Sequence, residues 1–479
     1  MGGNRADGAT EIAGLTVDSR AVQAGDMFVA LPGAKFDGRA FIPEAIKAGA
    51  SAVLTTPGVD VTAGVSVVED NNPRRRYADL AARFFETQPS TQVAVTGTNG
   101  KTSVADFTRQ LWQAIGKEAA SIGTLGVRSG AVERPGGLTT PDPMALHEAL
   151  CALAGAGVTH TALEASSHGL DQYRMDGVRF KAAAFTNLTR DHLDYHKSEQ
   201  GYFYAKARLF GELLNPGDAA VINTNSGWGA VLEDIAWGRG LVRLSVGTGK
   251  DVALQLLKQQ VEPTGQCISF SFEGKNYDVA LPLVGGFQAE NALLAAGLVI
   301  ATGGDADAVF AALEKLEGVP GRMELIGVSG AGGAVFVDYA HTPDGLVTVL
   351  NAARAHKPNA LHVVFGCGGD RDAGKRPQMG AIATELADHV YVTDDNPRSE
   401  DAATIRSEIM AATTGVIEIG DRGAAIEAAI SKLQAGDMLV VAGKGHEEGQ
   451  LIGEDVLPFS DIKTVKKILG KTISRVGAK

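Results

Sequence analysis

The sequence predicts an α/β protein of three successive domains. Short apolar runs with strand character alternate with helical patterns along most of the 479 residues, an order typical of parallel sheets covered by helices. Two breaks interrupt the alternation, at Gln88-Pro89-Ser90 and around Gly318-Val319-Pro320-Gly321. A glycine-rich segment joins a strand to a helix directly after the first break. A chain of this length also corresponds to about three domains of average size.

Residues 1–88 are expected to form a small α/β domain. Apolar runs at 27–31, 52–54 and 65–68 are separated by turn-forming residues. Residues 73–86 follow with the spacing of an amphipathic helix. This helix would close the domain just before the first break.

Residues 89–318 are expected to form a central domain with a parallel sheet like that of phosphate-loop ATPases. Residues 93–95 are an apolar strand, the glycine-rich segment follows, and residues 103–115 are compatible with a helix. That order is the context that a phosphate loop requires. Further strands are expected at 159–163, 182–186, 219–223 and 267–272, and helices at 144–154, 199–213 and 288–302.

Residues 319–479 are expected to form a C-terminal, Rossmann-like α/β domain. Its apolar runs again alternate with helical stretches, which indicates a mostly parallel sheet. Strands are expected at 334–338, 361–365, 389–392 and 438–442, and helices at 343–353, 379–386 and 421–433.

Charge and composition exclude several classes of function. The 44 Lys and Arg against 56 Asp and Glu give a net charge of −12, which disfavours binding to nucleic acid. The longest apolar stretch is about half of what a membrane-spanning helix needs, so we expect no membrane insertion. The three cysteines are far apart, which fits a reducing compartment. We therefore expect a cytoplasmic protein, and a monomer.

The glycine-rich segment Gly97-Thr98-Asn99-Gly100-Lys101-Thr102 is the strongest single feature of the sequence. Its glycines allow backbone N–H groups to face phosphates, while Lys101 can neutralise phosphate oxygens. The Thr102 hydroxyl can bind Mg²⁺. The segment departs from the standard phosphate loop, because the first glycine of that pattern would fall at Val95. Glu164 directly follows the expected strand 159–163, and ligands of α/β sheets bind at this end of the strands. Thr102 and Glu164 are therefore candidate Mg²⁺ ligands.

Several motifs in order along the chain resemble the Mur ligase family, the amino-acid-adding enzymes of peptidoglycan synthesis. The shortened phosphate loop is the first of them. The others resemble the family's N-x-x-x-D-H-x-D, G-R-x-E and D-Y-A-H-x-P segments, and they are Asn187–Asp194, Gly321–Glu324 and Asp338–Pro343. Asp18-Ser19-Arg20 and Gly443-Lys-Gly-His-Glu447 extend the resemblance over nearly the whole chain.

The resemblance implies an ATP-dependent amide ligase, an acid–amino-acid ligase that forms ADP. ATP would phosphorylate a carboxylate, and an amine would then displace the phosphate. The implied ATP contacts are the loop residues 97–102 together with Asn291, Arg322 and Asp338. His192 would be a ligand of a second Mg²⁺, or would contact one of that ion's ligands. Lys206 would be carbamylated, which turns a cation into an oxygen ligand for the metal. With Lys101 and Glu164, these two residues form the implied catalytic set.

The resemblance also implies where the other two substrates bind. Ser19 would contact the uridine nucleotide of a UDP-muramoyl-dipeptide, and Thr139, Thr140, Ser166, Gln172 and Arg174 would contact its muramoyl peptide. Relatives often have Asn before Thr-Thr-Pro, where this chain has Leu138, so the resemblance does not imply a side-chain contact at that position. The implied amino-acid site consists of Arg371, Asp395, Asn396, Pro397, Arg398, Gly443 and Glu447.

Asp395-Asn396-Pro397-Arg398 resembles the motif of the branch that adds meso-2,6-diaminopimelate to UDP-N-acetylmuramoyl-L-alanyl-D-glutamate. This amino acid carries a second carboxylate at its far end, which a guanidinium binds in a bidentate manner. Lysine lacks that carboxylate. The lysine-adding ligase of the same family remains the alternative, disfavoured by Arg398.

Two further alternatives remain open. One is a ligase like folylpolyglutamate synthase, although a first domain with Asp18-Ser19-Arg20 has no place in it. The other is a protein that uses nucleotide binding to switch shape, which the phosphate loop alone would permit.

Overall fold

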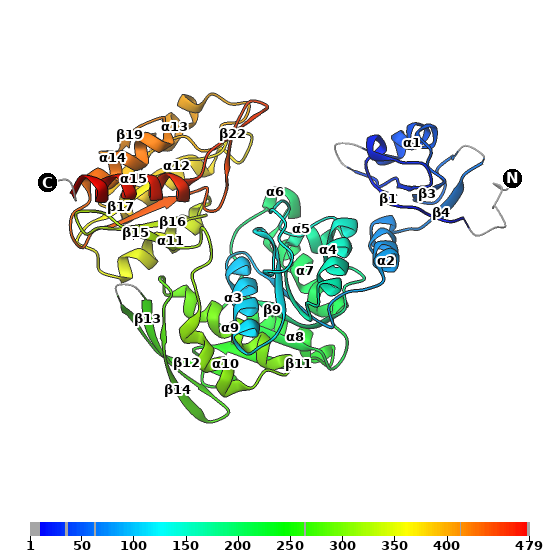
Figure 1. The fold of residues 1–479 in the computed structure, drawn as a ribbon, viewed down its shortest axis with the longest axis horizontal. Helices are drawn as coiled ribbons and strands as arrows, with labels where there is room; N and C mark the ends of the chain where they lie inside the picture. Colours follow the sequence, from blue (N-terminus) through cyan, green and yellow to red (C-terminus); the bar gives the residue numbers. More distant parts are fainter. Residues whose placement is uncertain (1–9, 34–36, 62–63, 263–264, 412, 477–479) are drawn as a thin grey trace.

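The computed structural model describes residues 10–33, 37–61, 64–262, 265–411 and 413–476, and it confirms the predicted α/β class. The described chain contains three main sheets, which follow one another along the sequence. The central sheet lies between the first and the third, which are at opposite ends of the molecule (Figure 1). The domain boundaries 88/89 and 318/319 stay predictions.

The first domain is a four-stranded parallel sheet in the order β1-β2-β3-β4. Its strands are β1 (Leu15–Thr16), β2 (Met27–Val29), β3 (Ala52–Thr55) and β4 (Ser66–Glu69). Its helices are η1 (Ser19–Ala21), η2 (Gly38–Phe41), α1 (Ile42–Ala48) and α2 (Pro73–Phe85).

Helix α2 connects the first domain to the central one. Its Tyr77 packs into the small core of the first sheet, and the Tyr77 hydroxyl donates a hydrogen bond of 2.6 Å to Asp142 in the central domain. Arg75 on the same helix lies 3.2 Å from Asp176. The helix is therefore held from both sides, which fixes how the first domain meets the second.

The central sheet has ten strands in the order β14-β13-β12-β11-β10-β9-β5-β8-β6-β7. The strands are β5 (Thr91–Thr96), β6 (Ala119–Gly123), β7 (Gly126–Arg128), β8 (His160–Glu164), β9 (Phe180–Phe185), β10 (Ala219–Asn223), β11 (Val242–Gly247), β12 (Leu254–Glu262), β13 (Gly265–Phe272) and β14 (Lys275–Leu281). The helices are α3 (Lys101–Ala114), α4 (Pro143–Gly155), α5 (Ser167–Asp171), α6 (Leu193–His196), α7 (Glu199–Arg208), η3 (Leu209–Leu213), α8 (Gly229–Gly238), α9 (Phe287–Ala301), α10 (Ala306–Ala312) and η4 (Leu313–Lys315).

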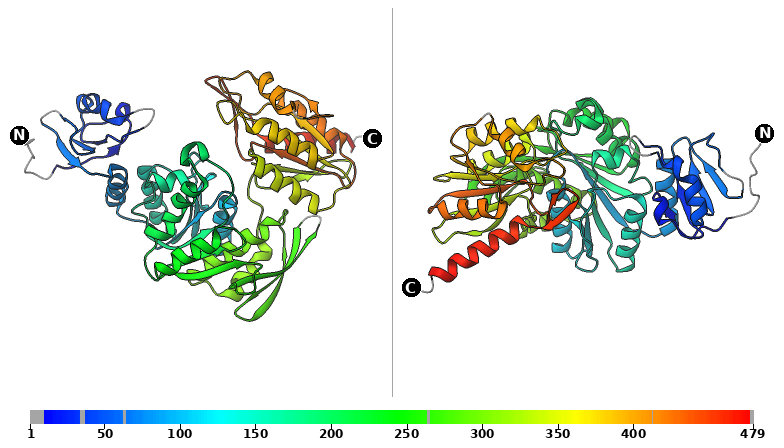
Figure 2. Two further views of the ribbon diagram at one scale, coloured as in Figure 1. Left: turned by 180° about the vertical axis from the view of Figure 1, so that it is seen from behind. Right: turned by 90° about the horizontal axis from the view of Figure 1, so that it is seen from above.

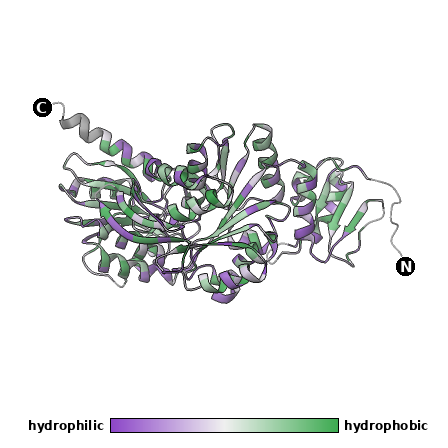
Figure 3. Ribbon diagram, turned by 90° about the horizontal axis from the view of Figure 1, so that it is seen from below, coloured by the Kyte–Doolittle hydropathy of each residue, from purple (hydrophilic) through white to green (hydrophobic). Residues whose placement is uncertain are grey.

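Helices cover both faces of this sheet because its central strands are apolar on both sides. Val93 and Val95 of β5 belong to one buried core, and Ala94 between them belongs to the other. Alternate residues of a strand point to opposite faces, so an uninterrupted apolar strand needs cover on each. Colouring by hydropathy shows helices with both green and purple residues around the sheets (Figure 3).

The predicted strand 267–272 is present, but it is not part of a parallel arrangement. It belongs to β13, which pairs antiparallel with β12 and with β14. The turn into β14 places Glu273 and Gly274 at φ of 49° and 78°. A two-residue turn with two positive φ values forces the strands that it joins to run antiparallel. β12 and β14 are strands that the sequence interpretation missed.

The third domain has a six-stranded sheet in the order β15-β16-β20-β17-β18-β19, parallel except for β15. Its strands are β15 (Glu324–Val328), β16 (Ala334–Asp338), β17 (Leu361–Phe365), β18 (His389–Val392), β19 (Ile417–Glu418) and β20 (Met438–Ala442), followed by the hairpin β21 (Gly449–Ile452) and β22 (Asp455–Pro458). Its helices are α11 (Pro343–Ala355), α12 (Lys375–Leu386), α13 (Ala402–Met410), α14 (Arg422–Lys432) and α15 (Asp461–Val476). Helix α15 packs on the third domain through the buried Val465 and Leu469, and its C-terminal end projects beyond the body (Figure 2). No helix within the described ranges is long and apolar enough to cross a membrane.

Candidate active site

A cavity of about 440 Å³ lies between the central and third domains, at the carboxyl ends of the central strands. Its lining includes the loop residues 98–102, Glu164 at the end of β8, and Arg322 and Asp338 from the third domain. The predicted residues Thr139, His192 and Asn291 also line it. The structure therefore brings most of the predicted ATP-binding and metal-binding residues to one cavity, where the strands of an α/β sheet place ligands.

Two glycines give the phosphate loop its path. Gly97 has φ of 148° and Gly100 has φ of 87°, both in the region that favours glycine. A Cβ atom on Gly100 would lie 2.5 Å from the Asn291 Oδ1 atom. The loop is thus packed against the side chain predicted to contact adenine, and helix α3 begins at Lys101.

Lys101 folds back over its own loop. Its ammonium group donates to the carbonyls of Gly97 and Thr98, at 2.9 and 2.8 Å. Burial lowers its pKa, although the Glu164 carboxylate acts in the opposite direction. The amine can release these two carbonyls when a phosphate offers stronger charge-assisted bonds.

Glu164 and Thr102 meet at the end of the loop. The Thr102 hydroxyl donates to Glu164 Oε2 at 2.9 Å, and Glu164 Oε1 accepts from the Thr124 backbone N–H at 2.8 Å. Thr124 was missed by the sequence interpretation, although it directly follows β6, just as Glu164 is the last residue of β8. Arg322 reaches across the domain boundary and donates to the Thr102 Oγ1 atom at 3.2 Å.

These side chains fit a magnesium ion, because Mg²⁺ takes oxygen ligands from one or two carboxylates and from phosphates and keeps several waters. Across the described part of the chain, no three His, Cys, Asp or Glu side chains form a ready-made metal cluster. A hydroxyl and a carboxylate beside a phosphate loop do not require such a cluster.

His192 and Lys206 occupy different positions at this site. His192 is half exposed, has φ of 52°, and lies 3.3 Å from Asp191. Desolvation lowers the pKa of its imidazole to about 4. Lys206 is buried on α7, its Nζ donates to the Gly97 carbonyl at 2.8 Å, and it lies over the Tyr202 ring at 4.3 Å.

Burial, together with the nearby Lys101 charge, holds the pKa of Lys206 well below its usual value. A lowered pKa favours the neutral amine, which is the form that can react with carbon dioxide.

Asp338 and Asn291 make hydrogen bonds that hold the lining of the cavity in place. The buried Asp338 carboxylate accepts hydrogen bonds of 2.7 Å from the N–H groups of Met323 and Ala340. Burial raises its pKa. Because Met323 adjoins Arg322, this carboxylate fixes the backbone that carries the arginine. Asn291 donates to Gln288 at 2.9 Å.

A second polar network lies beside the cavity. The Thr140 hydroxyl donates to the Glu164 carbonyl at 2.8 Å and accepts from the N–H of Ser166 at 2.9 Å. Arg174 donates to the Thr140 carbonyl and to Gln172, at 2.8 and 2.7 Å. This network of predicted peptide-binding residues is therefore linked to the backbone of Glu164, whose side chain is a candidate metal ligand. Ser19 lies apart from them in the first domain, in η1.

The predicted amino-acid site is a separate cluster in the third domain. Asn396 donates to Glu447 at 3.1 Å and accepts from the fully buried Lys444 ammonium at 2.8 Å. Lys444 lies inside a quoted motif, but its position between these two side chains needs the fold to be seen. Gly443 has φ of 119°, and a Cβ there would lie 2.9 Å from the buried Asp395 carboxylate.

Two loops carry the arginines of this cluster. Arg398, with φ of 53°, follows Pro397 and donates to the Gly369 carbonyl at 2.7 Å. Arg371 is exposed on the loop that contains Gly369. Neither arginine has an ion pair among the described side chains. The Cys367 thiol in this loop is buried, and burial raises its pKa to about 12, so it is a packing residue.

Comparison with known proteins decides the family. The domain described as "Mur ligase family, catalytic domain" matches residues 11–85, the "Mur ligase middle domain" matches residues 95–299, and the "Mur ligase, glutamate ligase domain" matches residues 321–445. The chain belongs to the Mur ligase family. The resemblance of the ordered motifs is thereby confirmed.

Full-length relatives carry one shared description. The UDP-N-acetylmuramoyl-L-alanyl-D-glutamate–2,6-diaminopimelate ligase of Bradyrhizobium diazoefficiens is 52% identical to this Mur ligase, covering 97% of this chain and 96% of its own. The protein of the same description from Rhizobium meliloti is also 52% identical, with the same coverage.

Solved structures show the same architecture. A structure described as a UDP-N-acetylmuramoyl-L-alanyl-D-glutamate–2,6-diaminopimelate ligase superposes with a TM-score of 0.70 at 34% identity, covering 96% of this chain and 95% of that one. A MurF ligase from Thermotoga maritima, solved in complex with ADP, superposes with a TM-score of 0.63 at 17% identity, covering 98% and 99% of the two chains. The second comparison concerns the fold alone.

Proposed function

We propose that this Mur ligase uses ATP to join meso-2,6-diaminopimelate to UDP-N-acetylmuramoyl-L-alanyl-D-glutamate during peptidoglycan precursor synthesis. The observation that carries the proposal is the description shared by relatives 52% identical over almost the full length of both chains. Arg398, unpaired in the amino-acid cluster, agrees with a substrate that has a second carboxylate. We further propose that the enzyme acts as a cytoplasmic monomer.

The first half of the reaction would take place at the cavity. A carboxylate oxygen of the acceptor attacks the γ-phosphorus of ATP, ADP leaves, and an acyl phosphate forms. Lys101 and Arg322 stabilise the charge on the transferring group, which needs positioned cations more than covalent help. Mg²⁺, held by Thr102 and Glu164, would supply further charge stabilisation. His192 and a carbamate on Lys206 would hold a second ion.

The second half of the reaction would join the amine. The neutral amino group of diaminopimelate attacks the acyl carbon, phosphate leaves, and the nitrogen loses a proton. Glu447 and Asn396 would hold the end of diaminopimelate that carries the ammonium group and forms the amide. Arg371 and Arg398 would bind the carboxylates of the substrate. Lys444 limits the freedom of Asn396 and Glu447 before any substrate arrives.

The acceptor would extend from the first domain to the cavity. Ser19 would bind its uridine nucleotide, and Thr139, Thr140, Ser166, Gln172 and Arg174 its peptide. The hydrogen bond from the Thr140 hydroxyl to the Glu164 carbonyl supports this arrangement, because the side chain of Glu164 is the proposed metal ligand.

Phosphate release with a panel of amino acids tests the proposal. UDP-muramoyl-dipeptide and ATP should support turnover with meso-diaminopimelate and not with L-lysine. Arg398→Ala should raise the KM for diaminopimelate by about 100-fold and leave the KM for ATP almost unchanged, since a hydrogen bond to a charged group contributes about 1.5–3 kcal/mol.

Arg354→Ala is the matched control, because this arginine of α11 pairs with Asp388 outside the cluster. Turnover with lysine alone would instead assign the lysine-adding reaction. ATP hydrolysis without acceptor and amino acid would favour a nucleotide switch.

A further inference from the structure

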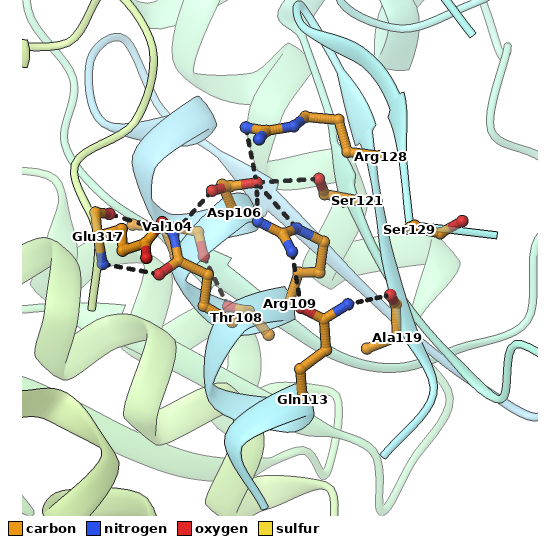
Figure 4. Close-up of polar contacts among 12 residues, drawn as sticks. Val104, Asp106, Thr108, Arg109, Gln113, Ala119, Ser121, Arg128, Ser129 and Glu317 are labelled. Atoms are coloured by element: carbon orange, nitrogen blue, oxygen red, sulfur yellow. Dashed lines mark hydrogen bonds and ion pairs between the residues drawn. The ribbon is translucent and has the colours of Figure 1, made fainter. Parts of the chain in front are cut away.

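A polar cluster on the phosphate-loop helix α3 reaches the linker between the central and third domains. At its centre is Asp106, which is 2% exposed. Arg109 lies 2.9 Å from its carboxylate and Arg128 lies 3.4 Å from it (Figure 4). The Ser121 hydroxyl is also directed at Asp106. The proposed reaction uses none of these groups.

Gln110 connects this cluster to the linker. Its Nε2 group donates to Asp106 Oδ2 at 2.9 Å and to the Glu317 carbonyl at 3.1 Å. Its Oε1 atom accepts from the Glu317 backbone N–H at 2.8 Å. One amide side chain thus holds both backbone polar groups of a residue more than two hundred positions away.

The Asp106 carboxylate fixes the orientation of this amide. A carboxylate only accepts hydrogen bonds, so the NH₂ group of Gln110 must face it. A flipped amide would set oxygen against oxygen at Asp106 and donor against donor at the Glu317 N–H. The three groups are therefore satisfied in one arrangement only.

The bonds from Gln110 to the backbone of Glu317 form a clamp on the linker. Directly after this clamp, the linker passes from the core of the central domain to the surface of the third domain. Leu316 and Val319 are buried in the core of the central domain. Two residues later, a Cβ on Gly321 would lie 2.4 Å from the His446 backbone nitrogen, so the chain there is packed against the third domain. Arg322 follows and donates to Thr102 at the phosphate loop. Any pivot between the domains is confined to the few residues between the clamp and Arg322.

We propose that Gln110, oriented by Asp106, is a positioning residue that fixes the linker at Glu317 and thereby sets the reach of Arg322 to the phosphate loop. Helix α3 carries both Thr102, which Arg322 contacts, and Gln110, which holds the linker. The proposal rests on the proposed function only in so far as Arg322 acts on bound nucleotide.

Nucleotide binding to the full chain tests this inference. Calorimetry with a non-hydrolysable ATP analogue and Mg²⁺ should give a Kd about threefold to tenfold higher for Gln110→Ala, a typical coupling within one hydrogen-bond network. Gln113→Ala is the matched control. Gln113 lies on the same helix, donates to the Ala119 carbonyl and accepts from Arg109 (Figure 4). Neither of these bonds reaches the linker, so loss of Gln113 should leave the Kd unchanged.

A double variant separates positioning from general support of the fold. Once Arg322→Ala has removed the guanidinium, Gln110→Ala should weaken binding no further. Effects that multiply in the double variant would overturn the proposal, as would a Gln110→Ala effect no larger than that of Gln113→Ala. Glu317→Ala should bind normally, since the clamp holds only the backbone of Glu317.

Two further measurements guard against misfolding and against a wrong function. If Gln110→Ala is unstable, Gln110→Glu replaces it in these measurements. The glutamate retains an acceptor and the side-chain volume, but Asp106 repels its carboxylate, so it should also weaken nucleotide binding. Hydrogen exchange of the peptide around Glu317 should accelerate in Gln110→Ala and not in Gln113→Ala. These readouts need neither acceptor nor amino acid, so absence of diaminopimelate ligation would overturn the proposed function and leave the clamp independently tested.

Discussion

Acid should destabilise the central domain through one buried histidine. His147 lies on α4, is 1% exposed, and its ring Nε2 is 3.5 Å from the Asp176 carbonyl. Burial lowers its pKa from 6.5 to about 4. Between these two pH values the unfolded chain binds the proton and the native one does not. Stability is therefore complete above pH 6.5 and falls as the pH decreases toward 4.

The size of the effect follows from these two pKa values. Protonation of the unfolded state lowers the free energy of unfolding by about 2 kcal/mol at pH 5 relative to pH 7.5. For a domain of about 200 residues, that corresponds to a decrease of about 4–8 °C in Tm. Gln at position 147 carries no charge at any pH and keeps an N–H donor. His147→Gln should therefore reduce the pH-dependent decrease in Tm by that amount.

Calorimetric melting at pH 7.5 and pH 5 measures the difference between the two proteins. Other buried histidines, such as His446, also have a lowered pKa and shift both proteins equally. If His147→Gln and wild type lose the same Tm on acidification, burial of this ring is not the cause.

Three other substitutions test separate parts of the structure. Asp461→Ala leaves the fully buried Arg422 without its partner at 2.7 Å, and urea unfolding should show a loss of about 3–5 kcal/mol, whereas an unchanged midpoint would contradict the pairing. Glu164→Gln should retain the fold, measured by melting, yet lower kcat by about 100-fold or more, since the charge beside the phosphates is gone; normal turnover would exclude Glu164 from the site. Tyr77→Phe removes the bond to Asp142 and should speed proteolysis after α2, because a hydrogen bond to a charged group contributes about 1.5–3 kcal/mol; unchanged cleavage would show that packing alone holds α2.

The sequence was most informative where structure is set by neighbouring residues. The strand, loop and helix around Lys101 were predictable because glycine spacing and apolar runs are local signals. Glu164 was predictable because it ends an apolar strand. Gln110 and Thr124 were not, since their partners Glu317 and Glu164 come close only after folding. In the antiparallel arm, β13 was predicted but β12 and β14 were missed, because charged and amide residues interrupt their apolar runs. The Glu273-Gly274 turn was the available signal.

Each of the three sheets is formed by one uninterrupted stretch of chain, and this has a consequence for how such an enzyme can diversify. A sequence change within residues 10–85 alters one small core and the α2 contacts, without entering the core beneath the phosphate loop. The domain proposed to bind the nucleotide-linked acceptor can therefore drift in sequence, or be exchanged as a whole, while the phosphate loop and its surroundings stay constant. The hydrogen bond from Tyr77 to Asp142 and the contact of Arg75 with Asp176 mark the attachment points that any replacement would have to reproduce.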